Sequence, residues 1–200
     1  MNIIGNIQDI DEARKHLKME FEMKDLGKTK FCLGLQIEHL YSGILAHQSC
    51  YVQKILEKFN MDKAYPYKTP MIVRSLDKEK DIFQSQEEGE EILGSKYPYL
   101  SLIGALMYLA NSTRPDIAFA VNLLARHSAA PTKCHWTRAK QILRYLNGTK
   151  DLGLFFQKTD DPNLVGYTDA GYLSDPHNAR SQTGFIFLHG GTAISWKSSK

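Results

Sequence analysis

The spacing of hydrophobic and polar positions changes several times along the chain, and each change predicts a different element. Apolar residues first recur at the three- and four-residue spacing of a helix, behind Asp9 as the expected N-cap. Residues 30–38 and 44–47 predict two strands, which a turn signal at 41–43 joins into a hairpin. A second helix is predicted from Ser49, with the inward positions Val52, Ile55, Leu56 and Phe59.

Within the next segment, 71–96, the stretch from Leu76 to Glu91 is mostly charged. Its acidic side chains cluster at Glu87, Glu88, Glu90 and Glu91. Such a composition is typical of a solvated linker or a weak helix, so this segment is expected to separate two structured regions.

Three helices are predicted over residues 97–148. The first covers about 99–111, with Leu102, Leu106 and Leu109 as its inward face. The second begins at Thr113-Arg114-Pro115-Asp116, which offers a capping threonine and a proline in the first turn. The third begins after Pro131 and ends at Asn147-Gly148, a pair well suited to closing a helix.

Beyond residue 148 the pattern becomes alternating and predicts short strands. These strands cover residues 152–156, 164–168, 183–188 and 193–196, with a hairpin turn at Gly190-Gly191. The predicted fold class is therefore α+β. The expected units are 1–70, 71–96, 97–148 and 149–200, and the last of them is expected to leave apolar faces and strand edges uncovered.

Composition narrows the class of protein only slightly. Hydrophobic residues make up 42% of the chain, enough for a packed core, and no apolar run approaches the roughly 20 residues that would span a membrane. The three cysteines, Cys32, Cys50 and Cys134, are widely spaced and odd in number, which favours reduced thiols in an intracellular protein. A net charge of +3 is compatible with an acidic polymer as partner but does not demand one.

Two features could contact nucleic acid. Lys133, Lys140 and Arg144 share an arc of the third predicted helix, beside its apolar arc, which suits a helix lying against a phosphate backbone. A solvated basic surface would give the same pattern. The hairpin over residues 31–47 could hold a nucleic-acid end, although an ordinary sheet edge would look similar in sequence.

One carboxylate is placed where metal ligands are often displayed. Asp169 lies in Gly166-Tyr167-Thr168-Asp169-Ala170 and is expected at the end of an apolar strand. Two-metal phosphodiester chemistry needs several carboxylates around two cations about 4 Å apart, so Asp169 alone is insufficient. Asp175 precedes a proline and is expected to form a turn. The spacing of His127, Cys134 and His135 fits no zinc pattern.

Several motifs in order give the chain a family resemblance. They include Thr113-Arg114-Pro115-Asp116 and Tyr167-Thr168-Asp169-Ala170. The other matching segments lie at residues 21–27, 33–37, 68–71, 102–109, 143–149 and 193–198. Over nearly its whole length the chain resembles the C-terminal part of a copia-type retrotransposon reverse transcriptase that continues into its ribonuclease H domain.

This resemblance implies roles for the polymerase part. Relatives carry a Tyr-Val-Asp-Asp motif just before the stretch that matches Met1 to Gly5, so the chain is expected to start beyond the catalytic aspartate pair. Residues 1–70 would be the end of the palm and 97–148 the thumb. The hairpin would be the primer grip, and its expected nucleic-acid contacts are Phe31, Leu33, Gly34 and His47.

The resemblance also implies a role for Asp169, as the first Mg²⁺-binding acid of a ribonuclease H-like domain cut short at residue 200. The next acids of that family come from later in the sequence. Where many relatives have a further acid, this chain has Gly171.

Three hypotheses follow from these observations. The chain is a catalytically incomplete fragment of an RNA-directed DNA polymerase/ribonuclease H, which binds no Mg²⁺ productively by itself. Alternatively, it is a weak non-catalytic module that binds nucleic acid, or it is active only when complemented by the missing parts of the polyprotein. Its expected partners are an RNA/DNA template–primer duplex and those missing parts, in an intracellular setting without a membrane.

Overall fold

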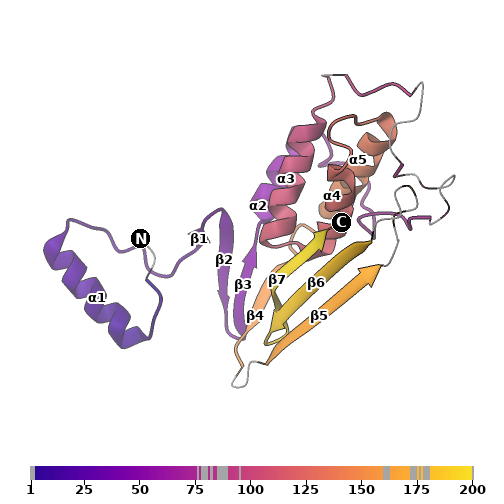
Figure 1. The fold of residues 1–200 in the computed structure, drawn as a ribbon. Helices are drawn as coiled ribbons and strands as arrows, with labels where there is room; N and C mark the ends of the chain where they lie inside the picture. Colours follow the sequence, from indigo (N-terminus) through magenta and orange to yellow (C-terminus); the bar gives the residue numbers. More distant parts are fainter. Residues whose placement is uncertain are drawn as a thin grey trace.

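The computed structural model describes residues 3–75, 77, 81, 83–84, 90–94, 96–159, 163–171, 175, 177 and 181–199. These residues form helices and antiparallel sheets, so the α+β class is confirmed (Figure 1). The helices are α1 (Ile7–Glu20), α2 (Ser49–Lys58), α3 (Tyr99–Ser112), the 3₁₀ helix η2 (Pro115–Ile117), α4 (Ala118–Ala125) and α5 (Lys133–Gly148). The strands are β1 (Phe31–Cys32), β2 (Leu35–Leu40), β3 (Gly43–His47), β4 (Gly153–Gln157), β5 (Leu164–Gly171), β6 (Gln182–His189) and β7 (Thr192–Ser199).

Helices α2 to α5 form the hydrophobic core. The predicted inward face of α3 is confirmed, because Leu102, Leu106 and Leu109 are all fully buried. Each such leucine contributes about 1.5–3 kcal/mol relative to an exposed one. The predicted apolar face of α2 is confirmed in the same way, since its four inward residues belong to this core.

The strands form two antiparallel sheets, one in the order β1-β2-β3-β4 and the other in the order β5-β6-β7. Strand β4 pairs with β3, and Phe156 lies opposite Ile44. The sheet that contains β2 and β3 therefore includes a strand from beyond residue 149, where a new unit was expected to begin. Local alternation predicted the strand but could not identify its partner, which lies more than 100 residues earlier in the chain.

The strand expected over residues 30–38 is interrupted by a tight turn at Leu33 and Gly34. Both residues have positive φ angles, 50° and 82°, as a two-residue type I′ hairpin turn requires. Cys32 pairs with Leu35 on either side of this turn. The prediction of one continuous strand was wrong because leucine at positive φ is not a recognisable turn signal.

Two predicted helix caps were also wrong. Asn6, rather than Asp9, caps α1: its side chain accepts a hydrogen bond from the Asp9 backbone N–H. Thr113 does not cap the second helix of the bundle. It is buried, and its hydroxyl donates to Gln48 Oε1 at 2.9 Å. A tertiary partner has thus replaced the local capping bond.

The expected solvated linker is partly built into the core. Asp81 and Phe83 are each only 2% exposed, and Arg74 donates to the Asp81 carboxylate at 2.8 Å. Glu87 and Glu88 lie outside the described residues. Asp81 can be buried because its ion pair with Arg74 offsets the cost of desolvation. The charge pattern alone does not show this pairing.

Helix α1 contrasts with this core. None of its residues is buried, and it lies apart from the rest of the molecule (Figure 1). Strand β5 is an edge of its sheet and is exposed from Leu164 to Ala170, so the predicted uncovered apolar edge is confirmed for this strand. In the part of the chain that the structure describes, no helix is long and apolar enough to cross a bilayer.

Candidate nucleic-acid interface

The β1–β2 hairpin ends in an exposed tip. Leu33 is 91% exposed at the turn, Gly34 is exposed beside it, and Phe31 is 66% exposed on β1. These three predicted contact residues therefore lie together. His47 does not join them, because it is buried on β3, where Nδ1 bonds to Ser49 Oγ at 2.6 Å and Nε2 to Glu38 Oε1 at 3.0 Å.

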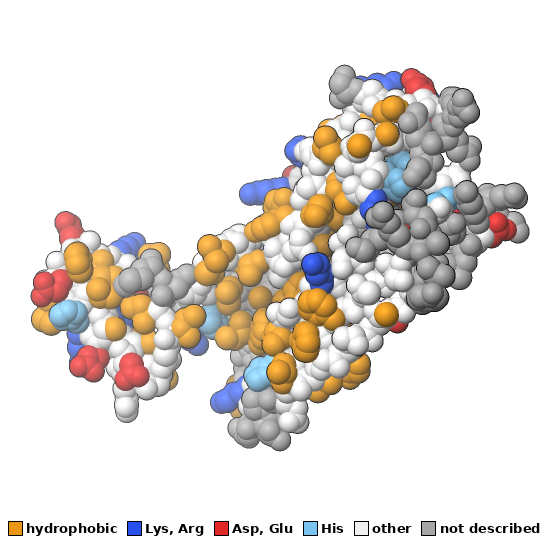
Figure 2. Space-filling view, viewed as in Figure 1, with side chains coloured by type: hydrophobic (Ala, Val, Ile, Leu, Met, Phe, Trp, Pro, Cys, Tyr) orange, Lys and Arg blue, Asp and Glu red, His pale blue; other side chains and the backbone are white. Residues whose placement is uncertain are grey.

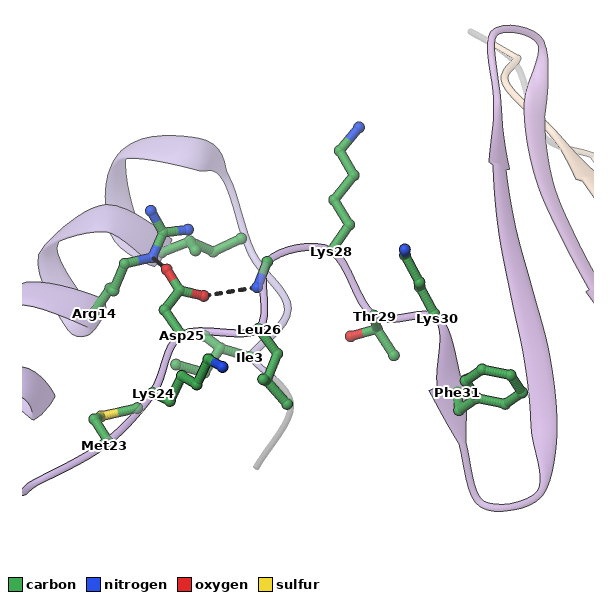
Figure 3. A pocket seen from close by; sticks show the side chains of 12 residues that line it. Ile3, Arg14, Met23, Lys24, Asp25, Leu26, Lys28, Thr29, Lys30 and Phe31 are labelled. Carbon is green, nitrogen blue, oxygen red and sulfur yellow. Dashed lines mark hydrogen bonds and ion pairs between the residues drawn. The ribbon is translucent and has the colours of Figure 1, made fainter.

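A cavity of about 670 Å³ lies between α1 and the loop that leads into β1. Arg14 bonds Asp25 there at 2.9 Å. The hydrogen bond from the Gly27 N–H, with the nearby Arg14 charge, holds the pKa of Asp25 below its usual value. Figure 3 shows the Lys28 and Lys30 side chains projecting to the same side of this loop. Two cationic side chains therefore lie just before the β1–β2 hairpin.

Helix α3 presents one open face beside the hairpin. Its exposed residues are Leu100, Ser101, Gly104, Met107, Tyr108 and Asn111. Their spacing places them on a single side of the helix. Figure 2 shows hydrophobic side chains gathered over α3 and the neighbouring strands. A Cβ added at Gly104 would meet nothing within 4 Å, so the middle of this face is flat and open.

The face of α3 connects two other features. Tyr108 Oη donates to the Leu33 carbonyl at 3.1 Å, which joins the face to the hairpin tip. Lys58 Nζ donates to Ser101 Oγ at 3.0 Å, which joins it to the end of α2. Ser101 and Tyr108 are seven residues apart, or about 10 Å along the helix axis.

Three lysines surround a group of aromatic rings at the α2 end of this face. The Trp136 ring packs edge-on against Tyr97 and Phe59, with centroid distances of 5.7 and 6.3 Å. Each ring carries one ammonium group at 5.1–5.6 Å from its centroid. We call these cations the lysine cluster: Lys58, Lys96 and Lys140.

Two of the three side chains of the predicted basic arc of α5, Lys140 and Arg144, lie against aromatic rings, and the third, Lys133, does not. Lys140 belongs to the lysine cluster, while Lys133 is exposed and lies 3.8 Å from Glu91. The Arg144 guanidinium lies 3.7 Å from the centre of the Tyr67 ring, and its Nε donates to the Tyr65 carbonyl at 2.6 Å. Cation–π contacts of this kind contribute about 0.5–1 kcal/mol at exposed sites and restrict where each charge can lie.

Asp169 lies on the other sheet, on β5 opposite Gly184. Asp169 was expected at the end of the strand, but the strand continues to Gly171, so the acid lies inside it. Its side chain is exposed. The described residues contain no group of three or more His, Cys, Asp or Glu side chains that could hold a metal, so they do not by themselves fit a Mg²⁺ site at Asp169.

The two histidines considered for zinc have structural partners. The rings of His127 and His135 stack 4.1 Å apart, and His135 Nδ1 accepts from the Thr132 N–H in the capping box of α5. Burial, together with the neighbouring His135 and Arg126, lowers the pKa of His127 to about 4. Burial also lowers the pKa of His135. Both rings are therefore neutral at physiological pH and serve as packing groups.

Sequence reasoning missed four residues of this surface: Lys58, Lys96, Gly104 and Tyr108. The helical period of α3 could have shown that Gly104 and Tyr108 share its outer face. No sequence signal joins Tyr108 to Leu33, 75 residues earlier, or Lys58 to Ser101, 43 residues later.

Comparison with known proteins identifies the family. The reverse transcriptase (RNA-dependent DNA polymerase) family matches residues 1–73. The retrovirus-related Pol polyprotein from transposon TNT 1-94 of Nicotiana tabacum is 41% identical over 202 residues, which cover 99% of this chain and 15% of that protein. That from transposon RE2 of Arabidopsis thaliana is 34% identical over 188 residues, or 92% of this chain and 12% of that protein.

A shorter relative is matched over most of its own length. It is an uncharacterized mitochondrial protein of Arabidopsis thaliana, 32% identical over 188 residues, which cover 92% of this chain and 72% of that protein. No solved structure matches the chain. The chain belongs to the reverse transcriptase family found in the Pol polyproteins of copia-type retrotransposons, so the predicted resemblance to such a reverse transcriptase is confirmed.

Proposed function

We propose that this chain holds an RNA/DNA template–primer duplex, as the end of the palm and the thumb of a reverse transcriptase would. Residues 1–70 correspond in this proposal to the palm end, 97–148 to the thumb, and 149–200 to the start of a ribonuclease H-like region. The observation that carries the proposal is a single surface along α3. It joins the hairpin tip at Leu33 to the lysine cluster through Tyr108 and Ser101.

The chemistry of this surface suits a nucleic-acid backbone. Ammonium and guanidinium groups neutralise phosphates and release their counterions, which supplies most sequence-independent affinity. Here Lys140 and Arg144 are held over the aromatic rings of Trp136 and Tyr67, so less side-chain entropy is lost when phosphate binds. Gly104 leaves room for the close approach of a sugar–phosphate backbone between the two ends of the surface.

Duplex binding on this surface should weaken in proportion to the number of phosphates contacted as the salt concentration rises. If Lys58, Lys96, Lys140 and Arg144 each neutralise one phosphate, the logarithm of the affinity falls with the logarithm of salt concentration. Its slope is about −3 to −4. Fluorescence anisotropy of a labelled RNA/DNA hybrid, titrated with the chain at several salt concentrations, measures both the affinity and the slope.

The test uses paired charge reversals. Lys96→Glu with Lys140→Glu breaks no hydrogen bond within the described residues and is expected to weaken binding at least about tenfold and flatten the slope by about 2. Lys15→Glu with Lys158→Glu is the matched control, because it makes the same change in net charge on two exposed lysines, one on α1 and one just after β4. Equal loss in both pairs would contradict the proposed surface.

The proposed role is binding and not chemistry. Two-metal catalysis needs several carboxylates, and Asp169 would act as a Mg²⁺ ligand only together with carboxylates from other parts of a Pol polyprotein. We expect no primer extension and no cleavage of the hybrid's RNA strand when the chain is incubated with Mg²⁺. Either activity, in a preparation free of contaminating enzymes, would overturn the binding-only role.

The relatives limit what this proposal includes. The chain spans about 15% and 12% of the two Pol polyproteins it matches. Polymerisation, cleavage and the choice of template are therefore assigned to the parent polyprotein. For this chain we propose only the contact with duplex and with the polyprotein's other parts.

A further inference from the structure

The turn at the hairpin tip has an unusual composition for its geometry. Two-residue type I′ turns favour Asn-Gly because both central residues need positive φ, and here the first position is leucine. Leu33 has φ of 50° and is 91% exposed, so packing of its own side chain does not explain the conformation. Something outside the turn must help to hold it.

Tyr108 of α3 provides that contact. Its hydroxyl donates to the Leu33 carbonyl at 3.1 Å. The ring is supported from behind by Tyr51 of α2, which packs edge-on at a centroid distance of 5.1 Å. The tip is thereby attached to a helix that lies 75 residues later in the chain.

Gly34 fits this contact as well as the turn. Its φ of 82° favours glycine, and a Cβ added there would also overlap the Tyr108 hydroxyl. The Tyr108 Cζ atom would be 3.6 Å away, an ordinary contact distance. The conflict is therefore confined to one oxygen atom.

We propose that Tyr108 is a positioning residue, which latches the Leu33–Gly34 turn onto α3 so that the hairpin tip and the face of α3 move as one surface. Its effect on duplex binding rests on the function proposed above. The latch itself does not, since it concerns the order of the hairpin. Gly34 and Tyr108 form a matched pair in which the missing side chain of one leaves space for the hydroxyl of the other.

A double-mutant cycle in the full chain tests the pair. Tyr108→Phe keeps the ring and removes the hydroxyl, and the amide hydrogens of residues 31–36 should exchange about two- to tenfold faster. Gly34→Ala should speed exchange further in the wild-type background. In the Tyr108→Phe background the same substitution should have a smaller effect, because the overlapping oxygen is gone. The cost of alanine at positive φ is present in both backgrounds and cancels.

Tyr145→Phe is the control. It also removes one tyrosine hydroxyl, which donates to Asp116 at 2.8 Å and not to the hairpin. It should leave exchange at the tip and the affinity for the RNA/DNA hybrid unchanged. Tyr108→Phe should lower that affinity about two- to fivefold while the circular dichroism spectrum stays the same.

The outcomes separate the two proposals. If wild-type protein does not bind the hybrid, the proposed function fails, yet the exchange data still decide whether the latch exists. If Tyr108→Phe leaves exchange at residues 31–36 unchanged, and the effects of Gly34→Ala and Tyr108→Phe simply add, the latch is wrong whether or not the hybrid binds.

Discussion

Arg114 joins two distant parts of the chain through one buried side chain. It is 1% exposed, and its guanidinium donates to Asp116 at 2.7 Å, to the Thr149 carbonyl at 2.9 Å and to the Thr149 hydroxyl at 2.8 Å. Burial alone would raise the pKa of Asp116, but the hydrogen bonds and charge of Arg114 lower it. The start of η2 is thereby tied to the end of α5.

Replacing Arg114 should be among the most damaging substitutions in the chain. Arg114→Met leaves the Asp116 carboxylate without its cation and the Thr149 carbonyl without the guanidinium donor, and we expect a loss of about 3 kcal/mol in the free energy of unfolding. Arg114→Lys should not restore it, because one ammonium group cannot reproduce the planar fork. Urea unfolding measures the free energy of unfolding of both variants. Arg14→Met on the exposed helix α1 is the control and should lose less than about 1 kcal/mol. A similar loss in both methionine variants would contradict this role.

The stacked histidines predict how stability depends on pH. The pKa of His127 is lowered to about 4 by burial, so the unfolded chain, with a histidine pKa near 6.5, binds the extra proton first. Stability should therefore fall as the pH drops from about 6.5 to 4, by about 1–2 kcal/mol after allowing for the partial exposure of the ring. The contribution of Asp116, whose pKa is depressed, is lost only below about pH 4.

His127→Phe tests this assignment because it keeps a ring in the stack and removes the titrating group. Urea unfolding of this variant and the wild type should show the same pH dependence above pH 7 and a smaller slope for the variant between pH 6.5 and 4.5. Equal slopes in that interval would show that His127 does not control the acid response.

The helices were predictable from the sequence because their inward faces repeat at helical spacing. Leu102, Leu106 and Leu109 of α3 are an example: a run of local positions determines both the helix and its buried side. The turn at Leu33 and the pairing of β4 with β3 could not be predicted in this way. One depends on a contact with α3, and the other on a strand more than 100 residues away.

The candidate interface, too, contains residues that the sequence could identify and contacts that it could not. The resemblance to the family pointed to Phe31, Leu33 and Gly34, which the structure brings together, and helical geometry pointed to Lys140 and Arg144. The surface that joins these two groups runs over α3 and depends on side-chain contacts between distant segments, such as Lys58 with Ser101. His47 was predicted as a contact residue, but it is buried.

Trp196 connects the second sheet to the helices. Its indole N–H donates to the Ala110 carbonyl at 2.7 Å, near the end of α3, where helix carbonyls lack partners within the helix. Strand β7 also packs against α4 and β4. The sheet is thus attached along β7, while β5 remains the exposed edge.

Trp196→Phe should loosen this attachment without unfolding the helices. It removes a hydrogen bond from a largely enclosed carbonyl, at a cost of about 1–2 kcal/mol. Limited proteolysis should then cut within residues 164–199 several-fold faster, with little change at α3 or α5. Tyr167→Phe, which removes an exposed hydroxyl from the same sheet, should leave the cleavage rate unchanged. Uniform cleavage throughout the Trp196→Phe variant would contradict a local attachment.

The molecule as a whole is uneven in how firmly its parts are held. Helices α2 to α5 form the core. The first sheet includes β3 and β4. The second sheet contacts the helices through β7. Helix α1 has no buried residue, and the segment that follows it includes Leu26, which is 83% exposed. Local stability follows the density of buried contacts, so opening should begin at α1.

Removing α1 should therefore leave the rest of the molecule intact. Trypsin should cut first in the exposed segment that carries Lys24, Lys28 and Lys30, and mass spectrometry should find a persistent fragment that begins near Phe31. A protein made of residues 31–200 should melt within about 2 °C of the full chain, because few apolar contacts are lost. It should also keep its affinity for the RNA/DNA hybrid, apart from any contribution of Lys28 and Lys30, since the hairpin tip, α3 and the lysine cluster remain. A markedly lower melting temperature would show that α1 supports the core through contacts that its exposure does not suggest.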